Sequence, residues 1–327
     1  MNVGMIGLKG HQGTVLNELK EAGCRLAAVW DDNPDALAAV PSWPSADPDT
    51  KTYTDWREML DREPLDLVCE AGTDNLRGGI VRACAARGIH LITEKPLALG
   101  LDELYAVRQA VEEHHLHLTM LLTMRFEPQY RLIRQVVADG LIGEVCQAAM
   151  QKSYRLGTRP AWQCSRQTFS GIIPFIGIHA LDLIRWCSGH DFIRGAAFCA
   201  NTGHPEIGDL EDNAALALQL DNGASAGARL DYCRPAAAPT HGDDRLRIAG
   251  NKGVIEFLYA TGEVTLLTHD QPPQVLPLPE PGKQFVNFVR SVRGEEPCEA
   301  PAEDCFRISE VVLRLREAAR DYRVVNL

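Results

Sequence analysis

The first third of this 327-residue chain alternates apolar strand-like runs with helix-like segments, and this alternation limits the possible folds more than any other feature. The strand-like runs are almost continuously apolar, which is typical of strands buried on both faces of a parallel sheet. A doubly wound α/β sheet of the Rossmann type is therefore predicted. The expected strands lie within 2–8, 25–30, 65–71, 91–97 and 116–122, and the expected helices near 14–22, 56–60, 78–87 and 101–114. The proline- and acid-rich residues 41–52 are expected to form a loop.

After about residue 123 the pattern changes to many short strands with hairpin signals. Strand-like runs occur at 145–153, 194–201, 213–220, 224–232, 245–249, 253–259 and 263–268, with helices expected at 127–139, 176–187, 284–293 and 303–320. This pattern predicts an α+β domain with a large, mostly antiparallel sheet. The expected division is therefore 1–122 and 123–327, with the last helix packing back on one of the two domains.

The formal net charge of −11 argues against nucleic acid or an anionic membrane as a main partner. The ten cysteines form no CxxC motif, which favours reduced thiols and a cytoplasmic protein. There is no apolar run of about 18 residues and no signal-peptide pattern, so a membrane anchor is not expected.

The loop after the first strand carries three glycines, Gly7, Gly10 and Gly13, in the spacing GxxGxxG. A glycine loop between a strand and a helix can bind a pyrophosphate, and an acid at the end of the second strand, here Asp31, can bind a ribose diol. The loop is one residue longer than the usual GxGxxG, so a glycine-rich turn without a ligand is the alternative. Because Asp32 follows Asp31, the paired acids would repel a 2′-phosphate, which favours NAD over NADP.

An ammonium group stands at the end of the strand within 91–97, at Lys95. Pro96 cannot extend the sheet and favours an extended backbone at Lys95. In open α/β sheets, ligands bind at the carboxyl ends of the strands. Lys95 is therefore placed at the predicted reaction centre, and a solvated lysine is the alternative.

Several motifs in a fixed order make the chain resemble the Gfo/Idh/MocA family of NAD(P)-dependent oxidoreductases over essentially its whole length. They are Glu94-Lys95-Pro96, Arg125-Phe126-Glu127-Pro128, residues 139–145, Gly177-Ile178-His179-Ala180-Leu181-Asp182, Glu211-Asp212-Asn213, Asp221-Asn222-Gly223 and residues 248–253. The resemblance implies a Rossmann domain, a C-terminal sheet domain and an active site between them. It also implies hydride transfer at a hydroxyl-bearing carbon of a sugar or polyol, and a homodimer or homotetramer formed through the outer face of the C-terminal sheet.

The resemblance and the chemistry together suggest which residues act. Lys95 is expected to hold the substrate oxygen, and His179 to exchange the hydroxyl proton, since imidazole titrates near neutrality. The expected cofactor contacts are Gly7, Gly10, His11, Gln12, Gly13, Asp31, Thr73, Glu94 and Lys95. The expected substrate contacts are Arg125, Tyr154, Arg155, Trp162, Arg166 and Asp182.

The chain also departs from the family at three places, one of which is the longer glycine loop. Phe175 stands where the resemblance implies a second catalytic carboxylate, and Thr73 and Arg77 stand where it implies a proline turn and a histidine. Arg77 is expected either to bind an anion or to be a solvated residue of a first helical turn. Asp182, three residues after His179, is expected to orient the imidazole or to face the domain interface. A metal pair is the weaker reading, because no further ligands cluster nearby, so no metal is predicted.

Residues 154–166 combine arginines with aromatic side chains inside an acidic protein. Arginines bind carboxylates and phosphates, so the segment indicates an anionic, sugar-like substrate, with a solvated loop or subunit contact as the alternative. The leading hypothesis is an NAD-linked oxidoreductase acting on a hydroxylated small molecule. The alternatives are a non-redox protein that binds a dinucleotide or sugar, and an NAD-assisted lyase or hydrolase.

Overall fold

The computed structural model describes all 327 residues, and they divide into two compact units. Unit 1 consists of Met1–Thr123 and Lys283–Arg307, and unit 2 of Met124–Gly282 and Ile308–Leu327. The first change of unit falls one residue from the expected boundary after residue 122. The second domain is not continuous, however, because Lys283–Arg307 belongs to the first unit. None of the helices is both long and apolar enough to cross a membrane.

Unit 1 is built on a six-stranded sheet in which every neighbouring pair is parallel. The strands are β1 (Asn2–Ile6), β2 (Arg25–Trp30), β3 (Ala46–Tyr53), β4 (Leu67–Glu70), β5 (His90–Thr93) and β6 (Leu118–Met120), in the order β3-β2-β1-β4-β5-β6. This arrangement confirms the predicted doubly wound parallel sheet. Because all strands run the same way, the loops after β1, β2, β4 and β5 leave the sheet at one edge.

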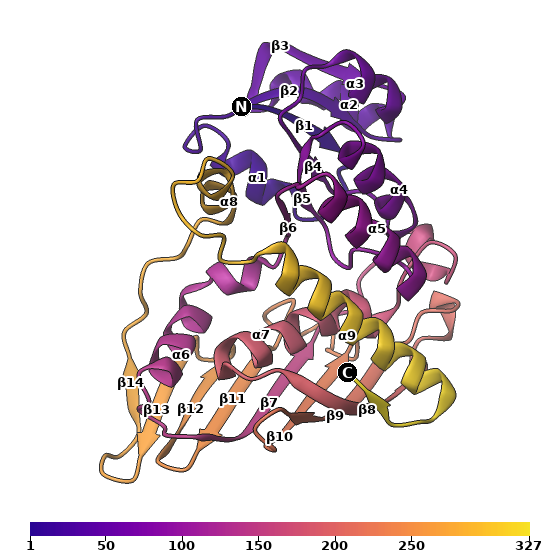
Figure 1. The fold of residues 1–327 in the computed structure, drawn as a ribbon. Helices are drawn as coiled ribbons and strands as arrows, with labels where there is room; N and C mark the ends of the chain where they lie inside the picture. The colour runs from indigo at the N-terminus through magenta and orange to yellow at the C-terminus, as the bar shows by residue number, and fades with distance from the viewer. The chain divides into compact units, whose positions relative to one another are not determined.

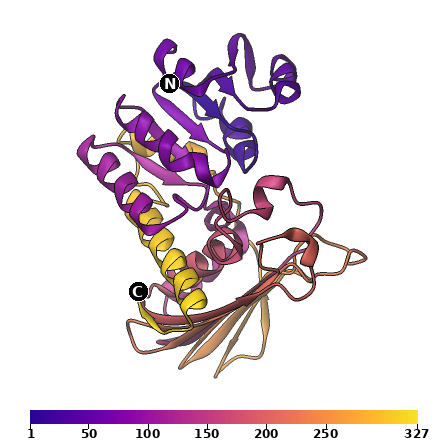
Figure 2. The same cartoon turned by 90° about the vertical axis from the view of Figure 1, so that its right-hand side faces the viewer.

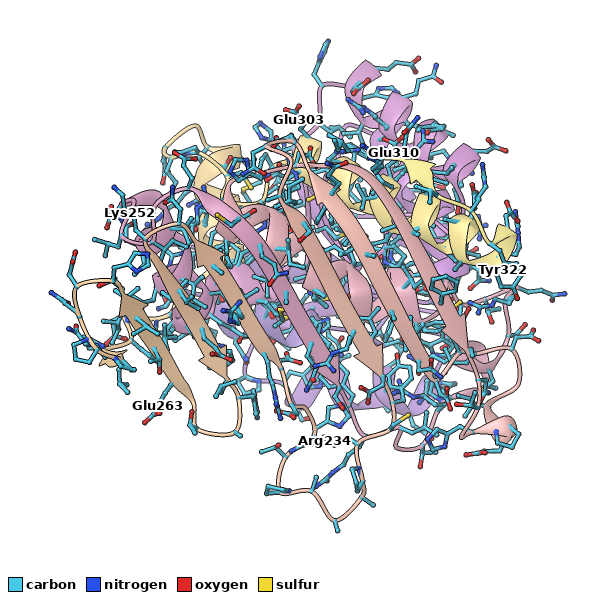
Figure 3. All side chains as sticks on the ribbon, turned by 90° about the horizontal axis from the view of Figure 1, so that it is seen from below. Arg234, Lys252, Glu263, Glu303, Glu310 and Tyr322 are labelled. Carbon is cyan, nitrogen blue, oxygen red and sulfur yellow. The ribbon has the colours of Figure 1, made fainter.

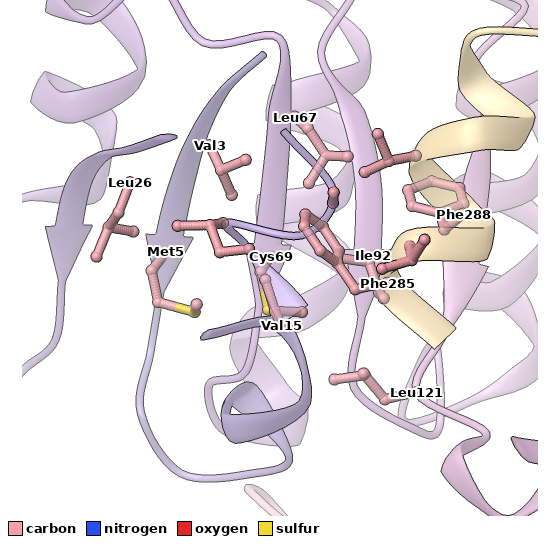
Figure 4. Close-up of a cluster of buried hydrophobic side chains, with 14 of the residues drawn as sticks. Val3, Met5, Val15, Leu26, Leu67, Cys69, Ile92, Leu121, Phe285 and Phe288 are labelled. Atoms are coloured by element: carbon pink, nitrogen blue, oxygen red, sulfur yellow. The ribbon is translucent and has the colours of Figure 1, made fainter. Parts of the chain in front are cut away.

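Helices lie on both faces of this sheet, with α1 and α8 on one face and α4 and α5 on the other (Figure 1). The helices of unit 1 are α1 (Gln12–Glu18), α2 (Pro34–Ala39), α3 (Trp56–Arg62), α4 (Asp74–Ala85), α5 (Leu101–Glu113) and α8 (Gln284–Val292), with a 3₁₀ turn, η1, at Val40–Ser42. Figure 4 shows Phe285 and Phe288 of α8 in the same buried cluster as Met5 and Ile92 of the sheet. The distant segment around α8 thus completes the core of unit 1.

The expectation of a loop at residues 41–52 is wrong, because most of this segment forms β3. Pro48 and the acids around it made the segment look irregular in sequence. β3 is the edge strand of the sheet and pairs only with β2. A proline is tolerated on such a strand, because one side of an edge strand has no hydrogen-bonding partner. The strand therefore forms despite its composition.

Unit 2 is built on a nine-stranded sheet, with only β7 and β10 pairing in parallel. The strands are β7 (Val145–Ser153), β8 (Phe192–Ala200), β9 (Asn213–Leu220), β10 (Ser225–Asp231), β11 (Arg245–Gly250), β12 (Gly253–Leu258), β13 (Glu263–Thr268), β14 (Gln274–Leu276) and β15 (Val325–Asn326). Their order is β14-β13-β12-β11-β7-β10-β9-β8-β15. This confirms the predicted large, mostly antiparallel sheet.

One face of this sheet is covered by helices and the other is bare, as Figures 1 and 2 show. The covering helices are α6 (Pro128–Ala138), α7 (Ile178–Ser188) and the later part of α9 (Ala302–Asp321). The chain also forms four short helical turns in this region: η2 (Thr123–Phe126), η3 (Ala161–Cys164), η4 (Ile173–Gly177) and η5 (Pro205–Ile207). The strands alternate accordingly: in β9, Leu216 is buried whereas Ala215 is exposed. Figure 3 views the bare face, where many side chains stand out from the strands.

Candidate functional site

The glycine loop leaves β1 at Gly7, which has a backbone conformation that only glycine adopts readily. Its φ of 85° is left-handed, and its N–H donates to the carbonyl of Trp30 at 2.7 Å. A side chain at Gly7 would lie 2.5 Å from the backbone of Gly72, which begins the loop after β4. The loops after β1 and β4 therefore approach each other closely at the carboxyl edge of the sheet.

Glu94 ties the glycine loop to the end of β5. Its Oε1 accepts from the backbone N–H of His11 and lies 2.7 Å from the Nδ1 atom of the same residue. Its Oε2 accepts the Lys95 N–H at 3.1 Å. A Cβ at Gly10 would overlap the Glu94 carboxylate, so Gly10 is needed for this close approach. The loop therefore binds an anion that belongs to the chain itself.

The carboxylate of Glu94 is held in its charged form. Burial alone would raise the pKa of Glu94, but the charge and hydrogen bond of His11, together with Lys95 and Arg77, outweigh burial and lower it to about 2. Opposite charges and hydrogen bonds to the ionised form act in this direction. The end of β5 thus carries a permanent negative charge beside the Lys95 ammonium.

Asp31, at the end of β2, is enclosed by backbone groups. Its carboxylate accepts the N–H of Leu8 at 2.8 Å and the N–H of Asn33 at 2.8 Å. Lys9 of the glycine loop also contacts it, with Nζ 3.5 Å from Asp31 Oδ1, and pairs with Asp32. Sequence reasoning missed Lys9, although it sits in the loop that is one residue longer than usual. Its charge partly cancels that of the two acids.

Arg77 has neither of the two roles expected for it. Its guanidinium is buried in unit 1 and donates to Glu70 at 2.7 Å, Asp74 at 3.1 Å, and the carbonyls of Pro96 at 2.7 Å and Gly72 at 3.1 Å. Burial raises the pKa of Glu70 even though Arg77 acts in the opposite direction. Arg77 is therefore neither a solvated helix residue nor an anion receptor, because its donors already link the loops after β4 and β5.

The remaining predicted residues of unit 1 lie on the same edge. Thr73 is the residue before α4, and its hydroxyl donates to the side chain of Asn75 at 2.7 Å. The Gln12 side chain accepts the N–H of Gly10 at 3.0 Å. Apart from its chain neighbours and the backbone of its own helix, no atom lies within 4 Å of the place where a Cβ would stand on Gly13. Lys95 follows directly after Glu94 and is joined to Pro96 by a cis peptide bond. Unit 1 therefore gathers all the residues predicted to bind the cofactor.

In unit 2, His179 is the second residue of α7, and three residues later Asp182 binds Arg125. The two Arg125–Asp182 bonds run from Nε to Oδ2 at 2.8 Å and from Nη2 to Oδ1 at 2.5 Å. Both side chains were predicted to contact substrate, and the structure pairs them with each other. Each is a bidentate partner of the other, which fixes the η2 segment to α7.

Phe175, in place of the carboxylate that the family resemblance implied, lies in η4 and belongs to an aromatic cluster. Its ring centroid is 4.8 Å from that of Phe169 and 6.4 Å from that of Trp162, and these two rings are 5.6 Å apart. All three contacts are edge-to-face, the arrangement that aromatic rings favour. Trp162, a predicted substrate residue, is thereby joined to the helical segment that leads into His179.

The loop after β7 brings together Tyr154, Arg155 and two residues that sequence reasoning missed. The ring of His241 stacks on Tyr154 with centroids 5.1 Å apart, and the Lys152 ammonium lies 5.0 Å from the Tyr154 centroid. Lys152 Nζ also donates to Asp244 at 2.6 Å. Strand alternation could have revealed Lys152, because it shares the buried face of β7 with Met150. Arg166, the other predicted arginine, pairs with Glu211.

Burial opposes the charge on Lys152, but Tyr154 and Asp244 outweigh it and raise the pKa of Lys152 above its usual value. Burial likewise raises the pKa of the Tyr154 phenol. For His241, burial and the nearby charges of Arg159 and Arg155 lower the pKa. This part of unit 2 therefore holds a charged lysine, a neutral phenol and an imidazole biased toward its neutral form.

Together, the parallel sheet and its glycine loop define a dinucleotide-binding protein with a second, sheet-based unit. Residues 1–121 match the family model described as an oxidoreductase family with an NAD-binding Rossmann fold, and residues 130–256 match the GFO/IDH/MocA C-terminal domain. The chain belongs to the Gfo/Idh/MocA family of oxidoreductases.

Similar proteins support this family assignment. A Thermotoga maritima protein assigned as an oxidoreductase is 31% identical, with a TM-score of 0.94 and complete coverage of both chains. The myo-inositol 2-dehydrogenase of Thermotoga maritima is 26% identical over 83% of this chain and 79% of its own. The Bacillus subtilis oxidoreductase YrbE, described as uncharacterized, is 26% identical over 65% of this chain. That match covers 61% of YrbE, which is less than two thirds of its length.

Proposed function

We propose that this protein is an NAD-linked dehydrogenase or reductase that acts on a hydroxyl-bearing carbon of a sugar, a polyol or a related, anionic small molecule. The observation that carries the proposal is the anchoring of the glycine loop by Glu94 next to Lys95, at the edge of a parallel sheet. Membership of an oxidoreductase family and similarity to a myo-inositol dehydrogenase support this class of reaction.

The residues of unit 1 fit a dinucleotide. The loop N–H of His11 already binds a carboxylate, and open space lies in front of Gly13. Gly7, Gly10, His11, Gln12 and Gly13 would hold the pyrophosphate, Asp31 the ribose diol, and Thr73, Glu94 and Lys95 the part nearer the reaction. A bound nicotinamide dinucleotide supplies the hydride acceptor or donor. NAD is the proposed form, since Asp31 and Asp32 still outnumber Lys9.

The chain's own groups would manage the substrate oxygen. In the oxidative direction the substrate carbon loses a hydride, its hydroxyl loses a proton, and a carbonyl forms. His179 accepts that proton, and the Lys95 ammonium donates a hydrogen bond to the oxygen as negative charge develops on it. In the reductive direction His179 returns the proton. Lys95 and His179 belong to different units of the chain, so each role is tested by its own variant.

The experiment has two stages. NADH and NADPH binding is measured by nicotinamide fluorescence, and turnover is then measured by absorbance of the reduced cofactor with a set of polyols and sugar acids. Lys95→Ala and His179→Ala should each lower kcat/KM by about 100-fold or more, in line with loss of an acid–base or oxyanion-stabilising group. A matched Lys20→Ala variant should behave as the wild type. If neither NADH nor NADPH binds, the proposal is overturned.

A non-redox binding protein is the second candidate, and Phe175 is the observation that favours it. The phenyl ring packs on Phe169 and cannot orient a hydroxyl or transfer a proton. Dinucleotide binding without turnover of any substrate in the set would favour this candidate. Turnover that yields an elimination or cleavage product with no net NADH would instead favour an NAD-assisted lyase or hydrolase.

We also propose that two copies associate through the bare face of the nine-stranded sheet. A shallow groove on this face is lined by small residues, including Ala149, Ala215 and Gly227. Arg229, Arg245 and Arg247 also line it, together with Glu256. A two-fold arrangement would bring the same small residues of both copies together and allow arginine–glutamate pairs at the rim. The oligomeric state in solution tests this proposal.

A further inference from the structure

Two arginines in the loop after β7, Arg155 and Arg159, carry charges that no acid in the structure neutralises. Arg155 makes no side-chain hydrogen bond or ion pair, and Arg159 donates only to the neutral Gln163, at 3.2 Å. The Nε atom of each is buried and has no hydrogen-bond partner. Both residues are only partly buried, but a buried polar atom without a partner is costly, so such atoms in native proteins usually have a ligand or a function.

The neighbouring cations contrast with these two. Lys152 is paired with Asp244 at 2.6 Å, and Arg166 is paired with Glu211. Arg234 lies 3.7 Å from Asp243. Among these neighbouring cations, only Arg155 and Arg159 lack an acidic partner, in a protein whose net charge is −11.

The fold anchors both residues against the same loop. Arg155 lies just after β7, and its backbone is held in place by two contacts. Its N–H donates to the carbonyl of His241 at 3.0 Å, and its backbone forms a β-bridge with Cys233. The Arg159 guanidinium lies 4.1 Å from the ring centroid of Tyr232. The two residues thus contact the two ends of one loop, residues 232–244, and Figure 3 shows that loop around Arg234 projecting beyond the ends of the strands.

The electrostatics at His241 agree with this placement of the two residues. Both guanidinium groups, after burial, lower the pKa of His241, so the field of each reaches the same imidazole. An anion bound there would offset this field. The planar fork of each arginine suits a carboxylate or a phosphate, which can accept two parallel hydrogen bonds.

We propose that Arg155 and Arg159 form a subsite for the carboxylate or phosphate group of an anionic substrate. The assignment of the anion to the substrate rests on the proposed function, whereas the anion site itself does not. Arg159 takes the place of Arg166 as the second arginine of this subsite, because Glu211 already neutralises Arg166. Tyr154 and His241, stacked beside Arg155, form the uncharged wall of the subsite.

The first experiment measures binding without any dinucleotide. Inorganic phosphate, D-gluconate and the neutral polyol D-sorbitol are titrated calorimetrically into the full chain. The wild type should bind the two anions, and the double variant Arg155→Gln, Arg159→Gln should bind them at least about tenfold more weakly, as expected when charge-assisted hydrogen bonds are lost. Sorbitol binding should not change. Arg323→Gln, an exposed arginine of unit 2, is the matched control and should behave as the wild type.

Two further variants protect this test from misfolding and from nonspecific charge effects. Arg155→Lys keeps the charge but loses the planar fork, and should bind gluconate more weakly than the wild type while keeping its melting temperature. Equal anion affinity in the wild type and the double variant would overturn the subsite, and so would an equal loss in Arg323→Gln. Binding of phosphate but not gluconate would identify a free anion, and would overturn the assignment to the substrate.

The second experiment compares kcat/KM for gluconate with kcat/KM for sorbitol. The ratio should fall by about tenfold or more in the double variant, since only the anionic substrate uses the arginines. A ratio that does not change would contradict the substrate assignment. If the protein turns over no substrate but still binds gluconate through these arginines, the proposed function is overturned and the anion site still stands. The two failures are therefore distinguishable.

Discussion

The ring of Phe175 packs edge-to-face on Phe169, with the two centroids 4.8 Å apart, one helical turn before His179. Trp162 completes the cluster and links it to η3. An aromatic cluster therefore occupies the segment in which the family resemblance implied a carboxylate. Phe175 therefore has a structural role. Its contact with Trp162 links the arginine-rich segment 154–166 to η4, the turn that leads into α7.

Phe175→Ala should loosen this segment and lower the free energy of unfolding by about 1–3 kcal/mol, less than for a fully buried phenylalanine because Phe175 is partly exposed. The Trp162 emission should shift to the red as the indole loses a ring neighbour. Phe175→Leu is the matched control and should lose less. Urea unfolding followed by fluorescence measures both effects, and an unchanged spectrum would show that the cluster does not hold Trp162.

The Arg77 network predicts a larger effect in unit 1. Arg77→Met removes the cation from buried Glu70 and Asp74 and leaves two carbonyls without their donor, which should cost about 3–5 kcal/mol. Arg87→Met removes an exposed ion pair with Asp61 and should cost less than about 1 kcal/mol. Chemical unfolding of both variants provides the comparison. Similar losses for the two arginines would contradict the structural role of Arg77.

Glu94 predicts how stability depends on pH. Its pKa is about 2 in the folded protein, below the ordinary value of 4.5. The stabilisation is therefore fully present above about pH 5, and is lost as the pH falls through 4.5 toward 2. Its size is about 3 kcal/mol, from 1.36 kcal/mol per unit. Glu94→Gln should be less stable than the wild type at pH 7, and the difference should shrink as the pH falls to 3. A difference in stability that stays constant across this pH range would contradict the lowered pKa of Glu94.

Lys9 predicts how the two dinucleotides are distinguished. It offsets part of the charge of Asp31 and Asp32, so Lys9→Ala should leave both acids facing a 2′-phosphate. The ratio of NADPH to NADH dissociation constants should rise by about 3- to 30-fold, which corresponds to a charge contact near a protein surface. Fluorescence titration measures both constants, with Lys20→Ala as the control. An unchanged ratio would mean that Lys9 does not face the ribose.

The proposed interface on the bare face of the nine-stranded sheet predicts that a variant of this face has a smaller oligomeric mass. Ala215→Glu places a charge among small residues in the groove, and two-fold pairing would bring two such charges close together. The variant should sediment as a smaller species than the wild type and keep its melting transition. Gln109→Glu, on an exposed part of α5, should leave the mass unchanged. A wild type that sediments as a monomer would rule out this interface.

Local patterns predicted the sheets well because strands and their loops are encoded by neighbouring residues. The parallel order of unit 1 and the gathering of Gly7, Gly10 and Glu94 at one edge follow from alternation and glycine placement. The edge strand β3 was missed because its composition resembles a loop, and only its position at the edge of the sheet makes Pro48 acceptable.

Pairings between distant residues were not predictable in this way. Arg125 and Asp182 are 57 positions apart, and no local spacing indicates that each would satisfy the other. Arg77 was misread for the same reason, since Glu70 and the Pro96 carbonyl approach it only after the sheet has formed. The roles of Lys95 and His179 remain predictions, because the geometry of each unit fixes the position of the residue but not its chemistry.

The return of α8 to unit 1 has a consequence for biosynthesis. The buried cluster around Met5 and Ile92 includes Phe285 and Phe288, which are synthesised about 280 residues after Met5. During elongation, the part of that sheet face that α1 does not cover would stay exposed while the whole of β7–β14 is made. The order of the elements thus delays completion of the first hydrophobic core until α8 has been made, and a fragment that stops at residue 123 would expose the part of that face that α8 covers.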